Sequence, residues 1–483
     1  WKQLKIYLEL AHSKLMKNIS IIYIGSFCLL LSLLSFFNII YSYYFNLYLN
    51  IDAYIYTLFI SLFIGCIILF KKKSEFKISI YHKIITVFLG YLFLPILIAL
   101  PYYLSIYNIS LLDCYFEAIS GFTSTGFSIF NNIKHLDQSL IIWRSTSQWV
   151  GGIYFLFSII LLIDIFDTTI KKSFTEFISF NFLETLKQYF KILIIYTLLT
   201  LLIFLILSLI NLRVFDSFNL SLSIISSGGF LPVDQLDSLF DTDLKRLFFT
   251  LSMLISFFSL FLLFNLFFLK FKKPKFFIED FYLIVFLTFL IIIFFVFLNY
   301  NRNFIITLTS IVTSISNIGF SFQTDNSNLN FIYIILVIIG GSLFSTSSGL
   351  RFFKVYNLIK FSLNDLLSHS KPNHIYTNKI IFSDNFIDQS EINKYFLSVI
   401  IFLLSLTLVC SLLTILDINF ETAFKLSILT LMNTVNSSAY GLQDFNFYTL
   451  GFYSKIVLIF FMIIGRVELI TLLILLKKFL FKN

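Results

Sequence analysis

The sequence has few charged residues, and this scarcity indicates its class. Of its 483 residues, 13% are charged and 58% are hydrophobic, whereas soluble domains carry about 25% charged residues. We therefore expect an integral membrane protein. The net charge of +9 does not indicate a nucleic-acid partner, because the positive residues stand in short clusters beside apolar runs.

Residue types that carry catalytic or metal chemistry are also scarce. The chain has four cysteines and five histidines. The cysteines lack metal-ligand spacing, the histidines form no HExxH-type motif, and no Gly-rich phosphate loop joins a strand to a helix. A membrane-embedded enzyme would need a clustered acid, base, nucleophile or metal set. We expect neither enzyme activity nor a covalent cofactor.

Long apolar runs dominate the rest of the chain. A spanning helix needs about 20 mostly apolar residues. Basic residues follow every even-numbered run, as at Lys71–Lys73 and Lys171–Lys172. The positive-inside rule then predicts a multi-pass protein of the cell (inner) membrane, surrounded by lipid, with both termini cytoplasmic. The ten candidate runs are 19–46, 52–70, 83–106, 138–166, 189–212, 243–271, 278–299, 331–350, 395–416 and 452–480.

Semi-polar stretches follow the third, fifth, seventh and ninth runs, and each is too short to span. Three of them contain a Gly-Phe pair, at intervals of about 100 residues, which indicates internal repeats. The predicted fold is an all-α integral membrane protein with ten transmembrane helices and four re-entrant pore helices. These form four pseudo-symmetric helix–pore loop–helix repeats of one orientation. The stretches are FEAISGFTSTGFS (116–128), FDSFNLSLSIISSGGF (215–230), FIITLTSIVTSISNIGFS (304–321) and FETAFKLSILTLMNTVNSSAYG (420–441).

The repeats divide the chain into six parts. We assign residues 1–77 to two leading helices, 78–175 to repeat 1, 176–275 to repeat 2, 276–361 to repeat 3, 362–394 to a polar cytoplasmic linker, and 395–483 to repeat 4. The composition leaves open whether the linker is disordered or docks a soluble partner.

Four re-entrant loops have a specific use in a membrane. Irregular backbone at membrane depth is tolerated where it lines a cavity, and a helix that ends there points its partly negative end at a cation. Carbonyls of the following segment replace the hydration shell of the ion. Close helix packing by small residues explains one such stretch equally well, but four matching stretches favour a cation filter. Hydroxyls that support the carbonyls or contact the ion are those of Thr123, Thr125, Ser226, Ser227 and Ser316.

Taken together, these motifs resemble a known family. The sequence is similar to the membrane subunit of the Trk/Ktr/HKT superfamily of potassium transporters, in particular the Trk branch, over essentially its whole length. The two leading helices are a feature of that branch. Besides the four stretches, the resemblance rests on WRSTSQWVGGI (143–153), GGSLFSTSSGLRFFKV (340–355) and GRVE (465–468).

The resemblance implies one filter glycine in each repeat. Three correspond to Gly126, Gly229 and Gly319. In the fourth loop the family has a Val-Gly pair where this chain has Val435-Asn436, so we expect Asn436 at the fourth position, with the left-handed dihedrals that Asn tolerates. Gly229 is expected to need backbone angles that a β-branched residue resists. The filter residues, where K⁺ is expected to bind, are Thr123, Ser124, Thr125, Gly126, Ser226, Ser227, Gly228, Gly229, Ser316, Asn317, Ile318, Gly319, Thr434, Val435 and Asn436.

A gate is expected at the break in the eighth run. Arg351 follows STSSG there and would block or repel ions below the filter, assisted by Ser345, Thr346 and Gly349. The alternative is an arginine that snorkels to the cytoplasmic interface. Phe344 and Ser348 stand where the family has glycine.

Charged residues within apolar helices are expensive and normally paired. Glu117 and Glu421 are expected at the starts of re-entrant helices, where a carboxylate favours the positive helix end. Each is also a candidate partner for a buried arginine. The charged residues concerned are Arg144, Arg466, Glu468, Glu117, Glu421 and Asp216.

The function implied by the resemblance is gated uptake of K⁺ through the filter. It also implies a homodimer and a cytoplasmic nucleotide-binding regulatory subunit. Two alternatives remain open. The first is a Na⁺-permeable or weakly selective channel of the same fold, suggested by Asn436. The second is an ion-coupled secondary transporter, a class that usually shows inverted repeats and acidic groups at the membrane midplane.

Overall fold

The computed structural model describes residues 21–70, 80–166, 182–260, 262–263, 278–298, 304–322, 329–370 and 389–467. In this part of the chain, seven helices are long and apolar enough to cross a membrane. All seven coincide with predicted runs, which confirms a multi-pass helical protein. They are α2 (Ile21–Tyr44), α3 (Ile51–Phe70), α4 (Ile80–Tyr103), α6 (Gln138–Phe166), α8 (Phe182–Leu209), α12 (Ile278–Leu298) and α16 (Gln389–Ile415).

The other three predicted runs form shorter helices. These are α10 (Asp243–Phe257), α14 (Asn330–Ile338) and α18 (Phe452–Val467). Glu468 and the rest of the tenth run lie outside the described residues. Run 331–350 is broken, as the sequence predicts: α14 ends at Ile338, and two short parallel strands, β1 (Ile339–Gly340) and β2 (Leu350–Arg351), enclose a loop at 341–349.

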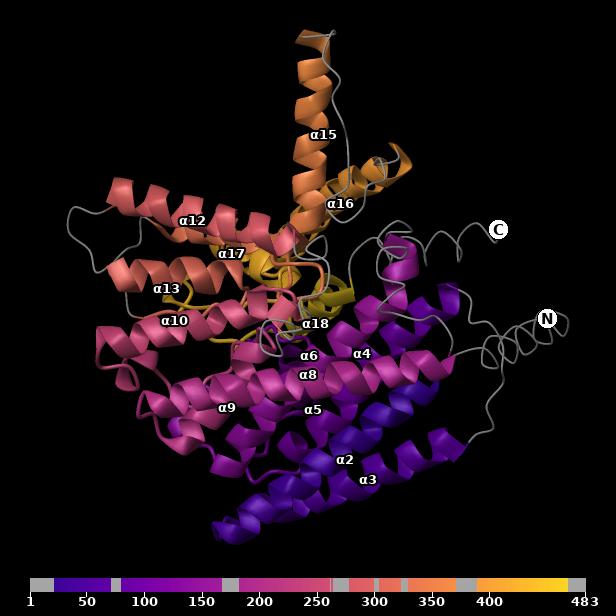
Figure 1. The fold of residues 1–483 in the computed structure, drawn as a ribbon. Helices are drawn as coiled ribbons and strands as arrows, with labels where there is room; N and C mark the ends of the chain where they lie inside the picture. Colours follow the sequence, from indigo (N-terminus) through magenta and orange to yellow (C-terminus); the bar gives the residue numbers. More distant parts are fainter. Residues whose placement is uncertain are drawn as a thin grey trace, which may run out of the picture.

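Helix α15 (Phe352–Ser370) follows β2 and leaves the helix bundle. It runs across the direction of the long helices rather than along it (Figure 1). The predicted linker at 362–394 is therefore partly helical, since α15 continues to Ser370 and α16 begins at Gln389. Short 3₁₀ turns lie at Tyr48–Asn50, Ile133–His135, Leu236–Ser238 and Ser438–Tyr440.

Four helices of 12 residues each overlap the predicted re-entrant stretches. The start of the first is fixed by Ser110, whose side chain accepts a hydrogen bond from the Asp113 N–H, as an N-cap does. The four helices are α5 (Leu111–Phe122), α9 (Val214–Ile225), α13 (Phe304–Ile315) and α17 (Phe420–Leu431).

These short helices are held in a closed ring. Helix α6 of repeat 1 contacts α9 of repeat 2, α10 contacts α13, α14 contacts α17, and α18 contacts α5. In each repeat, the helix that follows the 12-residue helix thus packs against the 12-residue helix of the next repeat, and the fourth repeat closes on the first. The leading helices α2 and α3 stand outside the ring, against α4 and α6 (Figure 1).

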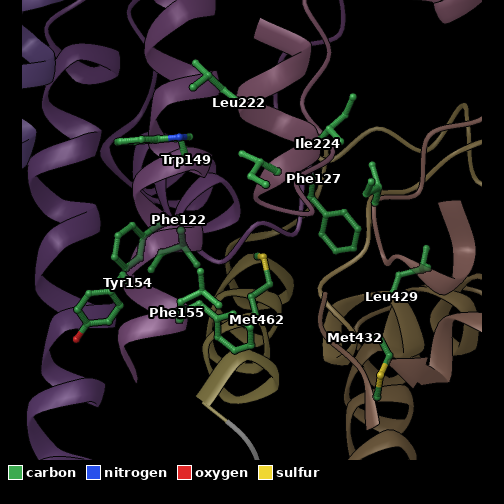
Figure 2. Close-up of a cluster of buried hydrophobic side chains, with 14 of the residues drawn as sticks. Phe122, Phe127, Trp149, Tyr154, Phe155, Leu222, Ile224, Leu429, Met432 and Met462 are labelled. Carbon is green, nitrogen blue, oxygen red and sulfur yellow. The ribbon is translucent and has the colours of Figure 1, made fainter. Parts of the chain in front are cut away.

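Apolar side chains from different repeats pack together in the core. Figure 2 shows Phe122 of α5, Phe155 of α6, Leu222 of α9 and Met462 of α18 within one buried cluster. Close packing of this kind resists small displacements, and it fixes the ends of the short helices relative to one another.

Candidate functional site

The four short helices end in four loops with the same backbone turn. Loops 1 to 4 comprise residues 123–127, 226–230, 316–320 and 432–436. The second residue of each loop is left-handed, with φ of 56° at Ser124, 52° at Ser227, 57° at Asn317 and 48° at Asn433. This turn ends a helix and satisfies its last carbonyls.

Backbone hydrogen bonds place the third residues of the loops in register. In each loop the third N–H donates to the carbonyl five residues earlier: Thr125 to Ser120 at 2.9 Å, Gly228 to Ser223 at 2.8 Å, Ile318 to Thr313 at 3.1 Å and Thr434 to Leu429 at 2.9 Å. The fourth positions are therefore equivalent as well.

The equivalent fourth positions are Gly126, Gly229, Gly319 and Val435. The prediction that Asn436 takes the fourth glycine position is wrong by one residue. Asn436 corresponds to the Phe of the Gly-Phe pairs, and its side chain turns away and donates to the Leu442 carbonyl at 3.1 Å. The fourth loop has no Gly-Phe pair, so its register could be read only from its turn.

Glycine is needed in the first three loops for two different reasons. Gly126 and Gly319 have φ of +84°, which strains any side chain. Gly229 has no positive φ, so the expectation that its backbone angles exclude a β-branched residue is wrong. Space excludes it instead: a Cβ on Gly229 would lie 2.7 Å from Cγ1 of Val435.

The hydroxyls at the start of loops 1 to 3 point back at their own helices. Thr123 donates to the Ile119 carbonyl at 2.8 Å, Ser226 to the Leu222 carbonyl at 2.9 Å, and Ser316 to the Thr313 carbonyl at 3.3 Å. These groups brace the helix ends. Of the two predicted roles, the hydrogen bonds favour support of the backbone over direct contact with an ion.

A buried ion pair lies beside loop 2 and the segment that follows loop 1. The Arg144 Nε donates to Glu117 at 2.9 Å, and the other carboxylate oxygen accepts from the Ile129 N–H at 2.9 Å. The Arg144 guanidinium also lies 4.2 Å from the ring centroid of Phe230. The expected pairing is thus present, but Glu117 lies in the middle of α5 and not at its start.

Glu421 pairs with a lysine and not with a buried arginine. It lies in the first turn of α17 as predicted, but it pairs with Lys425 at 2.5 Å on an exposed surface. The hydrogen bond from Lys425 and its positive charge lower the pKa of the Glu421 carboxyl below its ordinary value. Asp216 lies in the first turn of α9 and pairs with Arg213 at 2.9 Å.

Sequence reasoning missed the contact that closes the ring between repeats 4 and 1. Lys455 of α18 pairs with Asp113 of α5 at 2.5 Å, and it also donates to the Tyr448 carbonyl at 2.9 Å. Asp113 and Asp216 are each the third residue of their short helix. A comparison of the repeats would therefore have marked Asp113 as the counterpart of Asp216 and as a candidate for an ion pair.

Arg466 lies between the loops and the 341–349 segment. Its guanidinium donates to Ser348 and reaches the Ser124 hydroxyl at 3.4 Å and the Ser226 carbonyl at 3.5 Å. It is 1% exposed and stacks on the Phe155 ring at 3.8 Å. A buried cation therefore lies directly beside loops 1 and 2.

Arg351 lies in β2, and its side chain is buried against the 341–349 loop. It is 3% exposed, so it does not snorkel to the surface. Its Nη1 donates to the carbonyls of Ser342 and Ser347 at 3.1 and 2.9 Å and reaches the Ser345 hydroxyl at 3.3 Å. The arginine holds the loop in its folded form.

The 341–349 loop contacts loop 2 and helix α12. The Thr346 and Ser227 hydroxyls are 3.2 Å apart, which links this loop to loop 2. Gly349 has φ of +83° at the return into β2. From α12, Glu279 accepts the Leu343 N–H at 3.1 Å. The predicted gate residues Ser345, Thr346 and Gly349 thus lie in one loop next to loop 2, and Arg351 lies in the strand that follows this loop.

Comparisons with known proteins agree with this architecture. No protein-family model matches the chain. The Trk system potassium uptake protein TrkH of Salmonella typhimurium is 25% identical over 455 residues, which cover 88% of this chain and 91% of that protein. An uncharacterized cation transporter of Methanocaldococcus jannaschii is 26% identical over 336 residues, or 67% and 68% of the two chains.

One solved structure shares the fold. The crystal structure of the potassium transporter TrkH from Vibrio parahaemolyticus superposes with a TM-score of 0.81 at 22% sequence identity, over 95% of this chain and 98% of that one. At this identity the similarity establishes the fold.

Proposed function

Since the chain belongs to the Trk/Ktr/HKT superfamily, we propose that it is a potassium uptake pore of the Trk type. The observation that carries this proposal is the closed ring of four short helices, which end in four loops of equivalent backbone turn. A cation among these loops lies near four partly negative helix ends. The six-part division of the chain at the repeats is part of the proposal.

In this proposal, K⁺ loses its hydration shell as it passes the loops. Loop carbonyls replace the lost waters, as in other potassium filters. The hydroxyls of Thr123, Ser226 and Ser316 stabilise the helix ends, and the Glu117–Arg144 pair stabilises loop 2 and the segment that follows loop 1. The membrane potential drives the ion inward, since moving one charge through 100 mV releases about 2.3 kcal/mol.

The gate in this proposal is the 341–349 loop. Arg351 keeps the loop folded, and Arg466 adds a second positive charge beside loops 1 and 2. Two buried guanidinium groups oppose the passage of a cation, so opening requires this loop to move. A cytoplasmic nucleotide-binding subunit is the proposed cause of that movement, and the pore is proposed to work as a homodimer with both termini cytoplasmic.

A Na⁺-permeable or weakly selective channel is the second candidate. Val435 favours it, because a side chain at the glycine level makes the fourth loop unlike the other three. The two candidates differ in the ions that they admit.

Ion flux into proteoliposomes tests both. The purified chain is reconstituted, and uptake of ⁸⁶Rb⁺ is followed with K⁺ or Na⁺ as competitor. Strong competition by K⁺ and weak competition by Na⁺ supports the potassium pore. Equal competition supports the weakly selective channel. Cooperative unfolding shows that the purified protein is folded. If such protein gives no flux either with or without a cytoplasmic extract, both candidate functions are refuted.

A further inference from the structure

The fourth loop carries a branched apolar side chain at the level where the other loops carry glycine. A Cβ on Gly319 would lie 2.7 Å from Cγ1 of Val435, a Cβ on Gly229 would lie 2.7 Å from the same atom, and a Cβ on Gly126 would lie 2.9 Å from its Cβ. Three loops thus reach one isopropyl group. The Val435 side chain fills the space that the three glycines leave between the loops.

This side chain cannot serve as an ion ligand. A dehydrated cation needs oxygen atoms around it, and a hydrophobic constriction loses water and so stops ions. We propose that Val435 limits conduction and sets the ion preference of this chain, by forming an apolar constriction at the glycine level. This inference rests on the proposed function, that the loops conduct monovalent cations.

The surroundings of loop 4 keep the constriction in place. Asn433 donates to the Met462 carbonyl at 2.9 Å and to the Thr125 hydroxyl at 3.0 Å. Thr434 accepts from the Asn317 side chain at 3.3 Å. Hydrogen bonds thus join loop 4 to α18, loop 1 and loop 3. The ion path therefore widens by movement of the valine side chain rather than of the loop. Valine is stiff about χ1, and such movements are therefore few.

The backbone at Val435 permits the substitutions that test the proposed constriction. Val435 has no positive φ, so glycine and threonine both fit its backbone. Val435→Gly removes the isopropyl group, and Val435→Thr keeps its shape while replacing one methyl with a hydroxyl. The matched control is Asn436→Gly, which introduces the same flexibility one residue later, where the side chain faces the Leu442 carbonyl.

The full-length chain and these variants are reconstituted, and ⁸⁶Rb⁺ uptake is measured with Na⁺ as competitor. We expect Val435→Gly to take up Rb⁺ at least tenfold faster than wild type, with weaker competition by Na⁺. Val435→Thr is expected between the two, and Asn436→Gly is expected to gain less than Val435→Gly, because the Asn436 side chain faces the Leu442 carbonyl. K⁺ is also expected to raise the Tm of Val435→Gly more than that of wild type, because a ligand that binds the folded state stabilises it.

The failures of the two ideas are distinguishable. If wild type carries Rb⁺ and Val435→Gly matches it in rate, Na⁺ competition and K⁺-dependent Tm, the inference is overturned and the proposed function stands. An equal gain from Asn436→Gly also overturns the inference, because flexibility alone would then explain the effect. If no variant carries Rb⁺ and K⁺ shifts no Tm, the proposed function is overturned together with the inference.

Discussion

The Glu117–Arg144 pair provides the sharpest test of how the loops are supported. Both side chains are buried, with exposed fractions of 0% and 1%. Removal of one partner from a buried ion pair costs about 3–5 kcal/mol, because the remaining charge is left uncompensated. Glu117→Gln keeps the shape and one acceptor oxygen but removes the charge that faces Arg144. We therefore expect a loss of about 3–5 kcal/mol in the free energy of unfolding.

The measurement is equilibrium unfolding in detergent micelles, with ⁸⁶Rb⁺ uptake in parallel. Glu421→Gln is the matched control, because Glu421 is an exposed partner of Lys425, and it is expected to unfold like wild type. A double variant, Glu117→Gln with Arg144→Met, should regain stability relative to Glu117→Gln alone, because it removes the unpaired charge. If Glu117→Gln unfolds like Glu421→Gln, the pair does not hold the loops and this reasoning is refuted.

Three further predictions concern the proposed filter and the proposed gate. Gly229→Val should abolish Rb⁺ uptake at normal membrane expression, because its side chain would collide with Val435; normal uptake would contradict the four-loop arrangement. Arg351→Ala should raise flux in the absence of a regulatory partner, since it frees the 341–349 loop from four polar contacts; unchanged liposome flux would argue against a gate. Thr346→Val removes the hydroxyl that faces Ser227 and should change how strongly Na⁺ competes with Rb⁺ uptake, whereas Thr346→Ser should retain the wild-type competition. If both variants show the same Na⁺ competition, the contact between Thr346 and loop 2 does not affect ion preference.

The sequence alone determined the class of this protein and its repeated plan. Apolar runs of spanning length and the regular placement of lysines are properties of consecutive residues, so they needed no coordinates. The Gly-Phe pairs are also a local pattern, and they mark Gly126, Gly229 and Gly319, which occupy equivalent positions in the turns of loops 1 to 3. Each short helix ends within its predicted stretch, because a left-handed turn is decided by a few neighbouring residues, but α5 and α9 begin before their stretches, at Leu111 and Val214.

Only the tertiary structure decided the register of loop 4 and the partners of the buried charges. Val435 was placed at the glycine level by hydrogen bonds of its turn and by contacts with Gly126, Gly229 and Gly319, which come from three other repeats. Lys455 and Asp113 likewise meet only because the ring closes. Such contacts join residues hundreds of positions apart, and no local pattern encodes which of several equivalent carboxylates or glycines a side chain will meet.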